Sequence, residues 1–350
     1  MRPMFGALRF LLAYLVVASH LVGSEYLAHF GFYAVRGFFV ISGFLMTLSL
    51  NEVYLFNGTR FWLNRILRLL PPYFFVCAIT LAIVSAMPAQ AAMYLKFWRA
   101  APNLSDMLGN LAVLPLQFTG VSFRMVPPFW SVAVEIDMYL MLYLVIARRV
   151  GWAWLALIAG LTYQLAGTYA GMSWSGYYFT APAAVLPFSV GALLYFLVWQ
   201  NAWAVNGWIA AVACFAWLAN MMAGGWIFPD SYVFGIGYYV DTVLFTVVVA
   251  GLIGHRPPAM IEAVDKALGE WAYPVFLVQW LVGFVVATIF LHEVWRGWAL
   301  MLLATVPIAL AGVGLAVVNR KFVEPLRGRV REVGLQTLSA LGNGAHGASL

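Results

Sequence analysis

Residues 9–20 read RFLLAYLVVASH, an apolar run with an arginine at one end and a histidine at the other. A helix needs about 20 apolar residues to cross the hydrocarbon core of a membrane, and this run lies in the first of several windows of that length. Ten windows lie near residues 7–23, 31–50, 69–87, 130–147, 152–170, 181–199, 204–222, 233–253, 272–291 and 298–318. The stretch 103–118 is shorter, and we expect it to be interfacial or re-entrant. The sequence therefore predicts an all-α polytopic membrane protein with about ten transmembrane helices.

The composition excludes a soluble globular protein. Of the 350 residues, 64% are hydrophobic and 9% are charged, and the mean hydropathy is +0.89. An ordinary globular domain carries about 25% charged residues. The two cysteines, Cys77 and Cys214, lie inside apolar runs without the spacing of a zinc site, so we expect neither a disulfide nor a metal.

The basic residues predict the orientation in the membrane, because cytoplasmic loops are enriched in lysine and arginine. With a cytoplasmic N-terminus, fourteen of the 19 fall on inner segments. These are Arg2, Arg9, Arg60, Arg65, Arg68, Arg148, Arg149, Arg256, Lys266, Arg320, Lys321, Arg327, Arg329 and Arg331; the outer five are Arg36, Lys96, Arg99, Arg124 and Arg296. We expect both termini in the cytoplasm, one transmembrane domain over residues 1–332, and a disordered cytoplasmic tail over 333–350. Topology thus explains the net charge of +6 without a nucleic-acid partner.

The first run places two ionisable side chains on one helix face. His20 lies eleven positions after Arg9, which is about 16 Å along a helix axis and about 20° past a whole number of turns. Ionisable groups inside a bilayer are costly and mark functional sites by default. The alternative is that His20 caps the outer end of the helix in headgroup water.

Two further segments carry polar residues beside or within apolar runs. Ser42 and Gly43 interrupt the second run, where small residues admit a neighbouring helix or a ligand. Arg65 and Arg68 share one face of the helix that leads into the third run, and paired guanidinium groups suit phosphates. Helix packing and the ordinary positive-inside signal are the alternatives for these segments.

Carboxylates occur at unexpected positions in two other runs. Glu135 and Asp137 open the fourth run about 200° apart on a helix, so they face different surroundings. A packing or capping role is the alternative for either carboxylate. Asp241 lies within the eighth run without an evident partner, whereas His29 is expected in a solvated outer loop.

Taken in order, these features resemble the membrane acyltransferase-3 family of O-acyltransferases. The matching positions are Arg9 and His20 (Arg-x10-His), Phe38, Phe39, Ser42 and Gly43 (Phe-Phe-x-x-Ser-Gly), Arg65, Arg68, Pro71 and Tyr73 (Arg-x-x-Arg with Pro-x-Tyr), Trp130, Ser131, Glu135 and Tyr139, and Glu324 with Pro325. The resemblance runs from about residue 5 to residue 328. One position departs from the family pattern, because Gln279 stands where the family often has histidine. Because glutamine cannot titrate, we expect a structural or substrate-orienting role there.

The resemblance implies acyl transfer, usually of acetyl, from cytoplasmic acyl-coenzyme A to a hydroxyl of a glycan or glycolipid. The acceptors it suggests are a lipopolysaccharide sugar such as O-antigen, a lipid-linked exopolysaccharide unit, or a small secreted glycoside. It also implies a bacterial inner membrane location, no permanently bound cofactor, and the stand-alone type without a hydrolase-like domain. The expected partners are acyl-coenzyme A, the acceptor sugar and membrane lipid.

The residues and the resemblance together suggest a mechanism. We predict catalytic roles for His20, Glu135 and Ser42, and donor binding by Arg9, Arg65, Arg68, Tyr73 and Gly43. His20 would be the general base or a transient acyl carrier, Glu135 would orient its imidazole, and Ser42 would position the thioester or the oxyanion. The competing hypothesis is a proton-coupled transporter that uses His20, Glu135 and Asp241; a non-catalytic scaffold is the third.

Overall fold

The computed structural model describes residues 4–23, 25–118, 120–227, 235–253, 258–292 and 295–330, and within them it contains helices and no strands. The predicted tail over 333–350 lies outside these ranges. The helices are α1 (Gly6–Val22), α2 (Glu25–Leu48), α3 (Gly58–Ala86), α4 (Pro88–Tyr94), α5 (Leu104–Ala112), α6 (Trp130–Leu144), α7 (Val150–Tyr169), α8 (Trp174–Tyr178), α9 (Ala181–Leu194), α10 (Gly207–Ile227), α11 (Ile236–Ile253), α12 (Ala259–Phe290) and α13 (Trp298–Phe322).

Each of the ten predicted apolar runs corresponds to a helix. Among the described residues, 7 helices are long and apolar enough to cross a membrane: α3, α7, α11, α12, α13, α2 continued by the π-helical turn Ser49–Val53, and α9 with its flanking turns. Two more, α1 and α10, are apolar but shorter. The last, α6, has 15 residues and carries Glu135 and Asp137. The prediction of an all-α polytopic membrane protein is confirmed.

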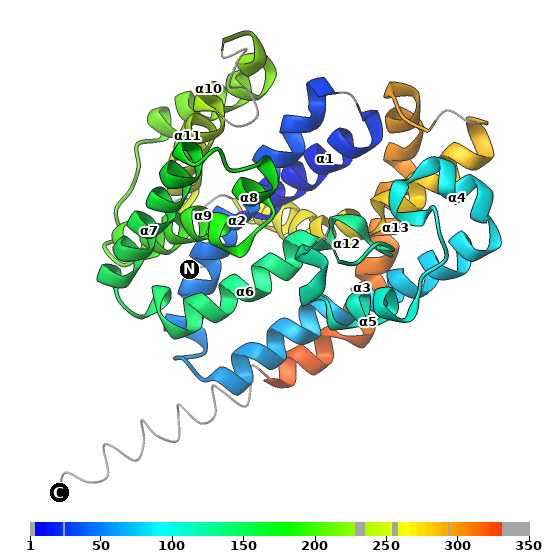
Figure 1. Ribbon diagram of the computed structural model, residues 1–350. Coiled ribbons are helices and arrows are strands. Elements are labelled where there is room, and N and C mark those ends of the chain that lie inside the picture. The colour runs from blue at the N-terminus through cyan, green and yellow to red at the C-terminus, as the bar shows by residue number, and fades with distance from the viewer. Residues whose placement is uncertain are drawn as a thin grey trace, which may run out of the picture.

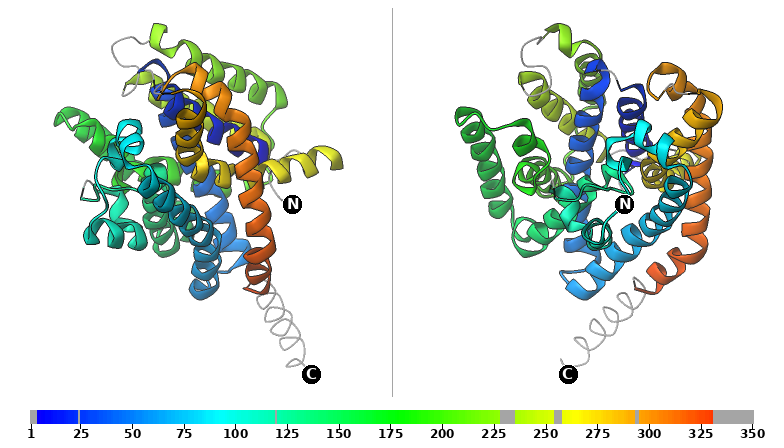
Figure 2. Two further views of the ribbon diagram at one scale, coloured as in Figure 1. Left: turned by 90° about the vertical axis from the view of Figure 1, so that its right-hand side faces the viewer. Right: turned by 45° about the vertical axis from the view of Figure 1, so that its right-hand side comes forward.

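Three helices, α1, α2 and α12, form the centre of the bundle. α12 packs against both α1 and α13, while α2 packs against α1 and α9, and α9 in turn packs against α7. α10 and α11 form a pair beside α2, and α6 contacts α2 and α9. The views of Figures 1 and 2 show α3 and α13 at one side of the molecule and α7, α10 and α11 at the other. The centre therefore joins residues from the first and last quarters of the chain.

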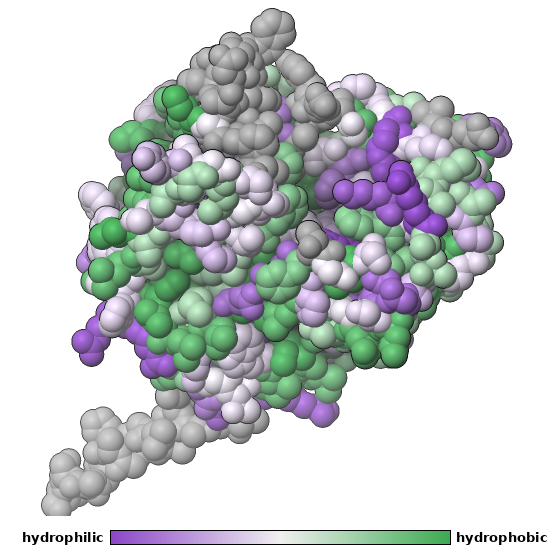
Figure 3. All heavy atoms as spheres, in the orientation of Figure 1, coloured by the Kyte–Doolittle hydropathy of each residue, from purple (hydrophilic) through white to green (hydrophobic). Residues whose placement is uncertain are grey.

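The surface of the bundle is apolar over wide areas, which Figure 3 shows in green. Leu155 is 54% exposed, Phe215 is 76% exposed and Leu302 is 71% exposed, each on a helix that flanks the bundle. Soluble monomers rarely expose contiguous apolar patches larger than a few hundred Å². Such an apolar surface suits a lipid surrounding, in which helices are one of the few structures that can pair their backbone polar groups.

The stretch 103–118, which was expected to be interfacial or re-entrant, forms a short helix and a turn. α5 has nine residues, and the turn Leu114–Gln117 follows it. Asp106 holds this region together, because its carboxylate accepts hydrogen bonds from the backbone N–H groups of Ser122 (2.8 Å) and Phe123 (3.1 Å). Burial opposes its charge, but these bonds keep the pKa of Asp106 below its usual value.

One sequence expectation about α2 is wrong. His29 was expected in a solvated outer loop, yet it is buried with 0% exposure, as is Arg36 with 1%. The reason is that α2 begins at Glu25, before the predicted run 31–50, so His29 becomes part of a helix packed against α1, α10 and α11. The ring atom Nε2 of His29 lies 2.7 Å from the carbonyl oxygen of Met221.

Candidate functional site

Three cavities lie in a row between the central helices, and neighbouring cavities share wall residues. We call them the basic cavity (about 550 Å³), the middle cavity (about 80 Å³) and the histidine cavity (about 160 Å³). The basic and middle cavities share Arg9, Leu45, Arg68 and Tyr273. The middle and histidine cavities share Val35 and Phe276. The row therefore runs from a charged region to His20, which lines the last cavity.

The basic cavity collects charged side chains from α1, α3, α12 and the end of α13. Its wall holds five basic residues, Arg9, Arg68, Lys266, Arg320 and Arg327, and three acidic ones, Asp265, Glu270 and Glu324. With five basic and three acidic residues, the wall of the basic cavity has a net positive charge, which suits an anionic ligand.

Two of the acidic residues are already engaged within the protein. Asp265 accepts hydrogen bonds from the backbone N–H groups of Gly6 (3.0 Å) and Ala7 (2.8 Å), which fixes the start of α1 against α12. The approach requires a glycine, because a Cβ at Gly6 would lie 1.7 Å from the carbonyl oxygen of Asp265. Glu324 forms an ion pair with Arg327.

The structure separates the two arginines of the Arg-x-x-Arg motif. Arg68 lines both the basic and the middle cavity. Arg65 lines none of the three cavities: it is buried, and its guanidinium donates to Asn64 Oδ1 at 3.0 Å and to the sulfur of Met46 at 3.3 Å. Arg9 and Arg68 are therefore the motif arginines that face the row of cavities.

Sequence reasoning missed three basic residues of this wall. Lys266, Arg320 and Arg327 were counted only as part of the positive-inside signal. The clue was the clustering of Arg320 and Arg327 with Glu324 directly after the last span. Only the packing of α13 on α12 brings them to Arg9 and Arg68.

In the middle cavity, Glu135 binds two hydroxyl groups. Ser42 and Tyr139 both donate to its Oε1, at 2.5 Å each. Glu135 also lies within electrostatic range of Arg9. Because the hydroxyl proton of Ser42 points at this carboxylate, Ser42 has only lone pairs to offer a ligand, which does not suit the expected role at an oxyanion.

His20 has a different partner from the one expected. Its Nδ1 lies 2.9 Å from Oε1 of Gln279, and its ring packs against Trp280 with centroids 5.0 Å apart. The amide of Gln279 is fixed, because its Nε2 donates to the carbonyl oxygen of Phe276 at 2.9 Å. Oε1 is therefore the atom that faces His20, so Nδ1 carries the proton and Nε2 is left unprotonated. Gln279 occupies the orienting position that was predicted for Glu135.

Two other predicted donor-binding residues lie away from the cavity walls. Gly43 permits close packing of α2 on α9, since a Cβ there would lie 2.3 Å from the carbonyl oxygen of Phe188. Tyr73 is fully buried, stacks on Phe129 with centroids 3.7 Å apart, and donates to the carbonyl oxygen of Asn110 at 2.9 Å. Both positions support the helix arrangement that surrounds the cavities.

A second buried charged cluster lies outside the three cavities. Asp241 on α11 and Arg36 on α2 are each 1% exposed and interact electrostatically. The guanidinium of Arg36 lies over the ring of Tyr238, 3.9 Å from its centroid. Asp241 thus lies apart from the cavities that hold Glu135 and His20, which is unlike the shared proton path that the transporter hypothesis needs.

These features define a class: an all-α polytopic membrane protein with a row of cavities that runs from a charged region to a partly buried histidine. The chain matches the family model described as an acyltransferase domain over residues 5–316. It therefore belongs to the membrane acyltransferase-3 family, and it is a membrane acyltransferase. Neither curated proteins nor solved structures gave a match to it.

Proposed function

We propose that this protein moves an acetyl group from cytoplasmic acetyl-coenzyme A to a hydroxyl of a glycan or glycolipid, in a bacterial inner membrane. The observation that carries the proposal is the row of cavities that joins Arg9 and Arg68 to His20. Coenzyme A has phosphates at one end and a thiol at the end of a long, thin arm. A positive cavity continued by a narrow apolar one is complementary to that shape.

In this proposal the phosphates bind in the basic cavity. Arg9 and Arg68 lie where it meets the middle cavity, so they would hold the phosphates nearest the arm. The amide N–H groups of the arm would donate to Ser42 Oγ, whose own proton is directed at Glu135. Glu135 is then a positioning residue that orients Ser42 and balances the charge of Arg9.

The chemical step uses Nε2 of His20. This atom takes the proton of the acceptor hydroxyl as the hydroxyl oxygen attacks the thioester carbonyl carbon. The carbon–sulfur bond breaks, and the leaving thiolate takes the proton back from Nε2. Each turnover then yields one ester and one coenzyme A thiol, and His20 returns to its starting state. The same nitrogen is also the atom that would carry a transient acyl group.

Aromatic side chains support a sugar as the acceptor. Phe32, Trp130, Tyr178 and Phe179 line the histidine cavity together with His20. Trp130 contacts Tyr178 and Phe179 with ring centroids 5.1 Å and 4.5 Å apart. Aromatic rings with polar edges suit a ligand that has both an apolar face and hydroxyl groups.

Donor binding can be tested without knowing the acceptor. Coenzyme A is expected to raise the melting temperature of the detergent-purified protein, since a ligand at 100 times its Kd stabilises the folded state by about 2.7 kcal/mol. Arg68→Gln should weaken coenzyme A binding about 10- to 100-fold, the loss of one charged hydrogen bond. The measurement is the melting temperature against coenzyme A concentration.

The matched control is Arg148→Gln. Arg148 is also on the predicted cytoplasmic side but lies outside the three cavity walls, where its Nε donates to the carbonyl oxygen of Tyr143 at 2.9 Å. This variant should keep the wild-type response. Equal weakening of coenzyme A binding by both substitutions would indicate non-specific charge attraction. A wild-type melting temperature that does not change with coenzyme A would contradict the proposal.

The orientation of His20 gives a further prediction. Gln279→Leu is expected to lower the maximal transfer rate about tenfold, with the donor KM unchanged, because the Nδ1 proton loses a hydrogen bond worth about 1 kcal/mol and the tautomer is no longer fixed. Gln164→Leu is the control, because Gln164 is also buried (1% exposed) but accepts from Tyr239 on the far side of the bundle. A rate loss shared by both variants would assign Gln279 a merely structural role.

A further inference from the structure

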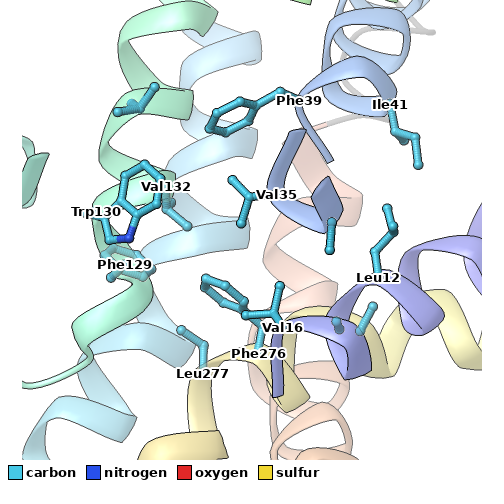
Figure 4. Close-up of a cluster of buried hydrophobic side chains, with 14 of the residues drawn as sticks. Leu12, Val16, Val35, Phe39, Ile41, Phe129, Trp130, Val132, Phe276 and Leu277 are labelled. Atoms are coloured by element: carbon cyan, nitrogen blue, oxygen red, sulfur yellow. The ribbon is translucent and has the colours of Figure 1, made fainter. Parts of the chain in front are cut away.

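Four apolar side chains separate the middle cavity from the histidine cavity. Val35 on α2 and Phe276 on α12 line both cavities, Val132 on α6 lines the middle one, and Val16 on α1 lines the histidine one. We call these four residues the collar. Figure 4 shows them between the four helices, with Val35 and Phe276 directed into the same interior space.

The collar is a packed structure. Val16, Val35, Val132 and Phe276 are 1%, 6%, 5% and 6% exposed, and they belong to the main hydrophobic core. Each comes from a different helix, so the space between these side chains is set by helix packing and not by a flexible loop. Overfilling such a site forces side chains off their preferred rotamers.

Polar groups lie on both sides of the collar. The middle cavity holds Ser42 and Glu135 on one side, and the histidine cavity holds His20 on the other. The collar itself offers no hydrogen-bond partner from its side chains. It therefore suits the apolar part of a ligand whose polar parts lie on either side.

We propose that the collar binds the acyl group of the donor and selects short chains. This inference rests on the proposed function, which brings a thioester from the middle cavity towards His20. The middle cavity measures about 80 Å³, so little room is left for further methylene groups at the collar. One additional methylene in a fixed apolar pocket changes recognition about 10- to 200-fold. Val35 and Phe276 are then specificity-determining residues, because both cavities share them.

The test compares donors that differ only in acyl length. The melting temperature of the purified protein is measured against coenzyme A, acetyl-coenzyme A, propionyl-coenzyme A and butyryl-coenzyme A. For the wild type, the apparent Kd is expected to rise at least tenfold from acetyl to propionyl and again to butyryl. Val35→Ala should reduce each of these increases in Kd several-fold, and Val35→Ile should weaken the binding of acetyl-coenzyme A itself. Unacylated coenzyme A should bind all variants equally.

Val40→Ala is the matched control. Val40 is also a buried valine of α2, with 0% exposure, but it lines none of the three cavities. Phe276→Leu is a second collar variant, which leaves the backbone carbonyl that holds Gln279 in place. If the rise in apparent Kd with acyl length is unchanged in both collar variants, the proposal for the collar is wrong. It is also wrong if Val40→Ala changes this rise as much as the collar variants do. The same Kd for all acyl lengths in the wild type would also overturn it while leaving the proposed function intact, whereas no binding of coenzyme A would overturn the proposed function.

Discussion

Replacing His20 with glutamine is expected to stop acyl transfer while the protein still folds and binds coenzyme A. A general base contributes about 10²- to 10⁴-fold to a rate, and glutamine cannot accept the proton of the acceptor hydroxyl at neutral pH. The measurement is transfer of radiolabelled acetyl from acetyl-coenzyme A into the glycan and lipid fractions of membranes that contain the protein. Thermal stabilisation by coenzyme A should stay near the wild-type value, because the arginines of the basic cavity are intact.

His29→Gln is the control for this experiment. His29 is a buried histidine in another membrane helix, and it lies beside the carbonyl oxygen of Met221. This substitution should lower stability but leave the transfer rate per folded molecule close to wild type. Retained acyl transfer in His20→Gln would exclude His20 as the general base or acyl carrier.

The two roles that His20 could have are separable. A transient acyl-histidine would leave radiolabel on the protein when acetyl-coenzyme A is supplied without acceptor, and His20→Gln would abolish that label. With His20 as general base, no label is expected without acceptor. Because the unprotonated Nε2 serves both roles, the tautomer that Gln279 selects is compatible with either result.

The second large effect is expected for Asp241→Ala, and it concerns stability. Asp241 interacts electrostatically with Arg36. Removal of one of two buried charges that interact costs about 3–5 kcal/mol, because the other charge remains in a low-dielectric interior. Asp241 and Arg36 are buried together, and the rings of Tyr238 and Tyr239 also lie beside Arg36. The melting temperature in detergent should fall sharply, whereas the transfer rate per folded molecule should change little.

The double variant Arg36→Met/Asp241→Leu sharpens this prediction. Apolar residues of similar size often replace a buried ion pair at little cost, so most of the lost stability should return. A proton-coupled carrier predicts the opposite pattern, since Asp241→Ala would fold normally and lose function. That pattern would assign Asp241 to a transport path and favour the hypothesis of a proton-coupled transporter.

The fold could be predicted from little more than the composition and the apolar periodicity of the sequence. Each apolar run became a helix because a chain in lipid must satisfy its backbone hydrogen bonds within each segment. The boundaries were less predictable: α2 begins at Glu25, so His29 belongs to the helix. Hydropathy also did not predict the surroundings of Arg36, which lies over the aromatic face of Tyr238 inside the bundle.

The candidate site was predictable in part. The geometry of a helix places Arg9 and His20 on one face, and both line the row of cavities. Arg65 and Arg68 share a face by the same geometry, yet only Arg68 lines a cavity of the row, while Arg65 bonds to Asn64 and Met46. Spacing along one helix states which residues lie together, but not what lies opposite them.

The sequence by itself determined that this protein is a helical membrane protein, and its ordered motifs indicated the acyltransferase family. These properties are local, since they depend on the side chains and spacing within single segments. The tertiary structure decided which residues meet: Gln279 reaches His20 across 259 residues of sequence, Glu135 binds Ser42 across 93, and the collar takes one side chain from each of four helices. Such contacts arise from the packing of α12 on α1 and of α6 on α2, which depends on the shapes of both helices in each pair and cannot be read from either one alone.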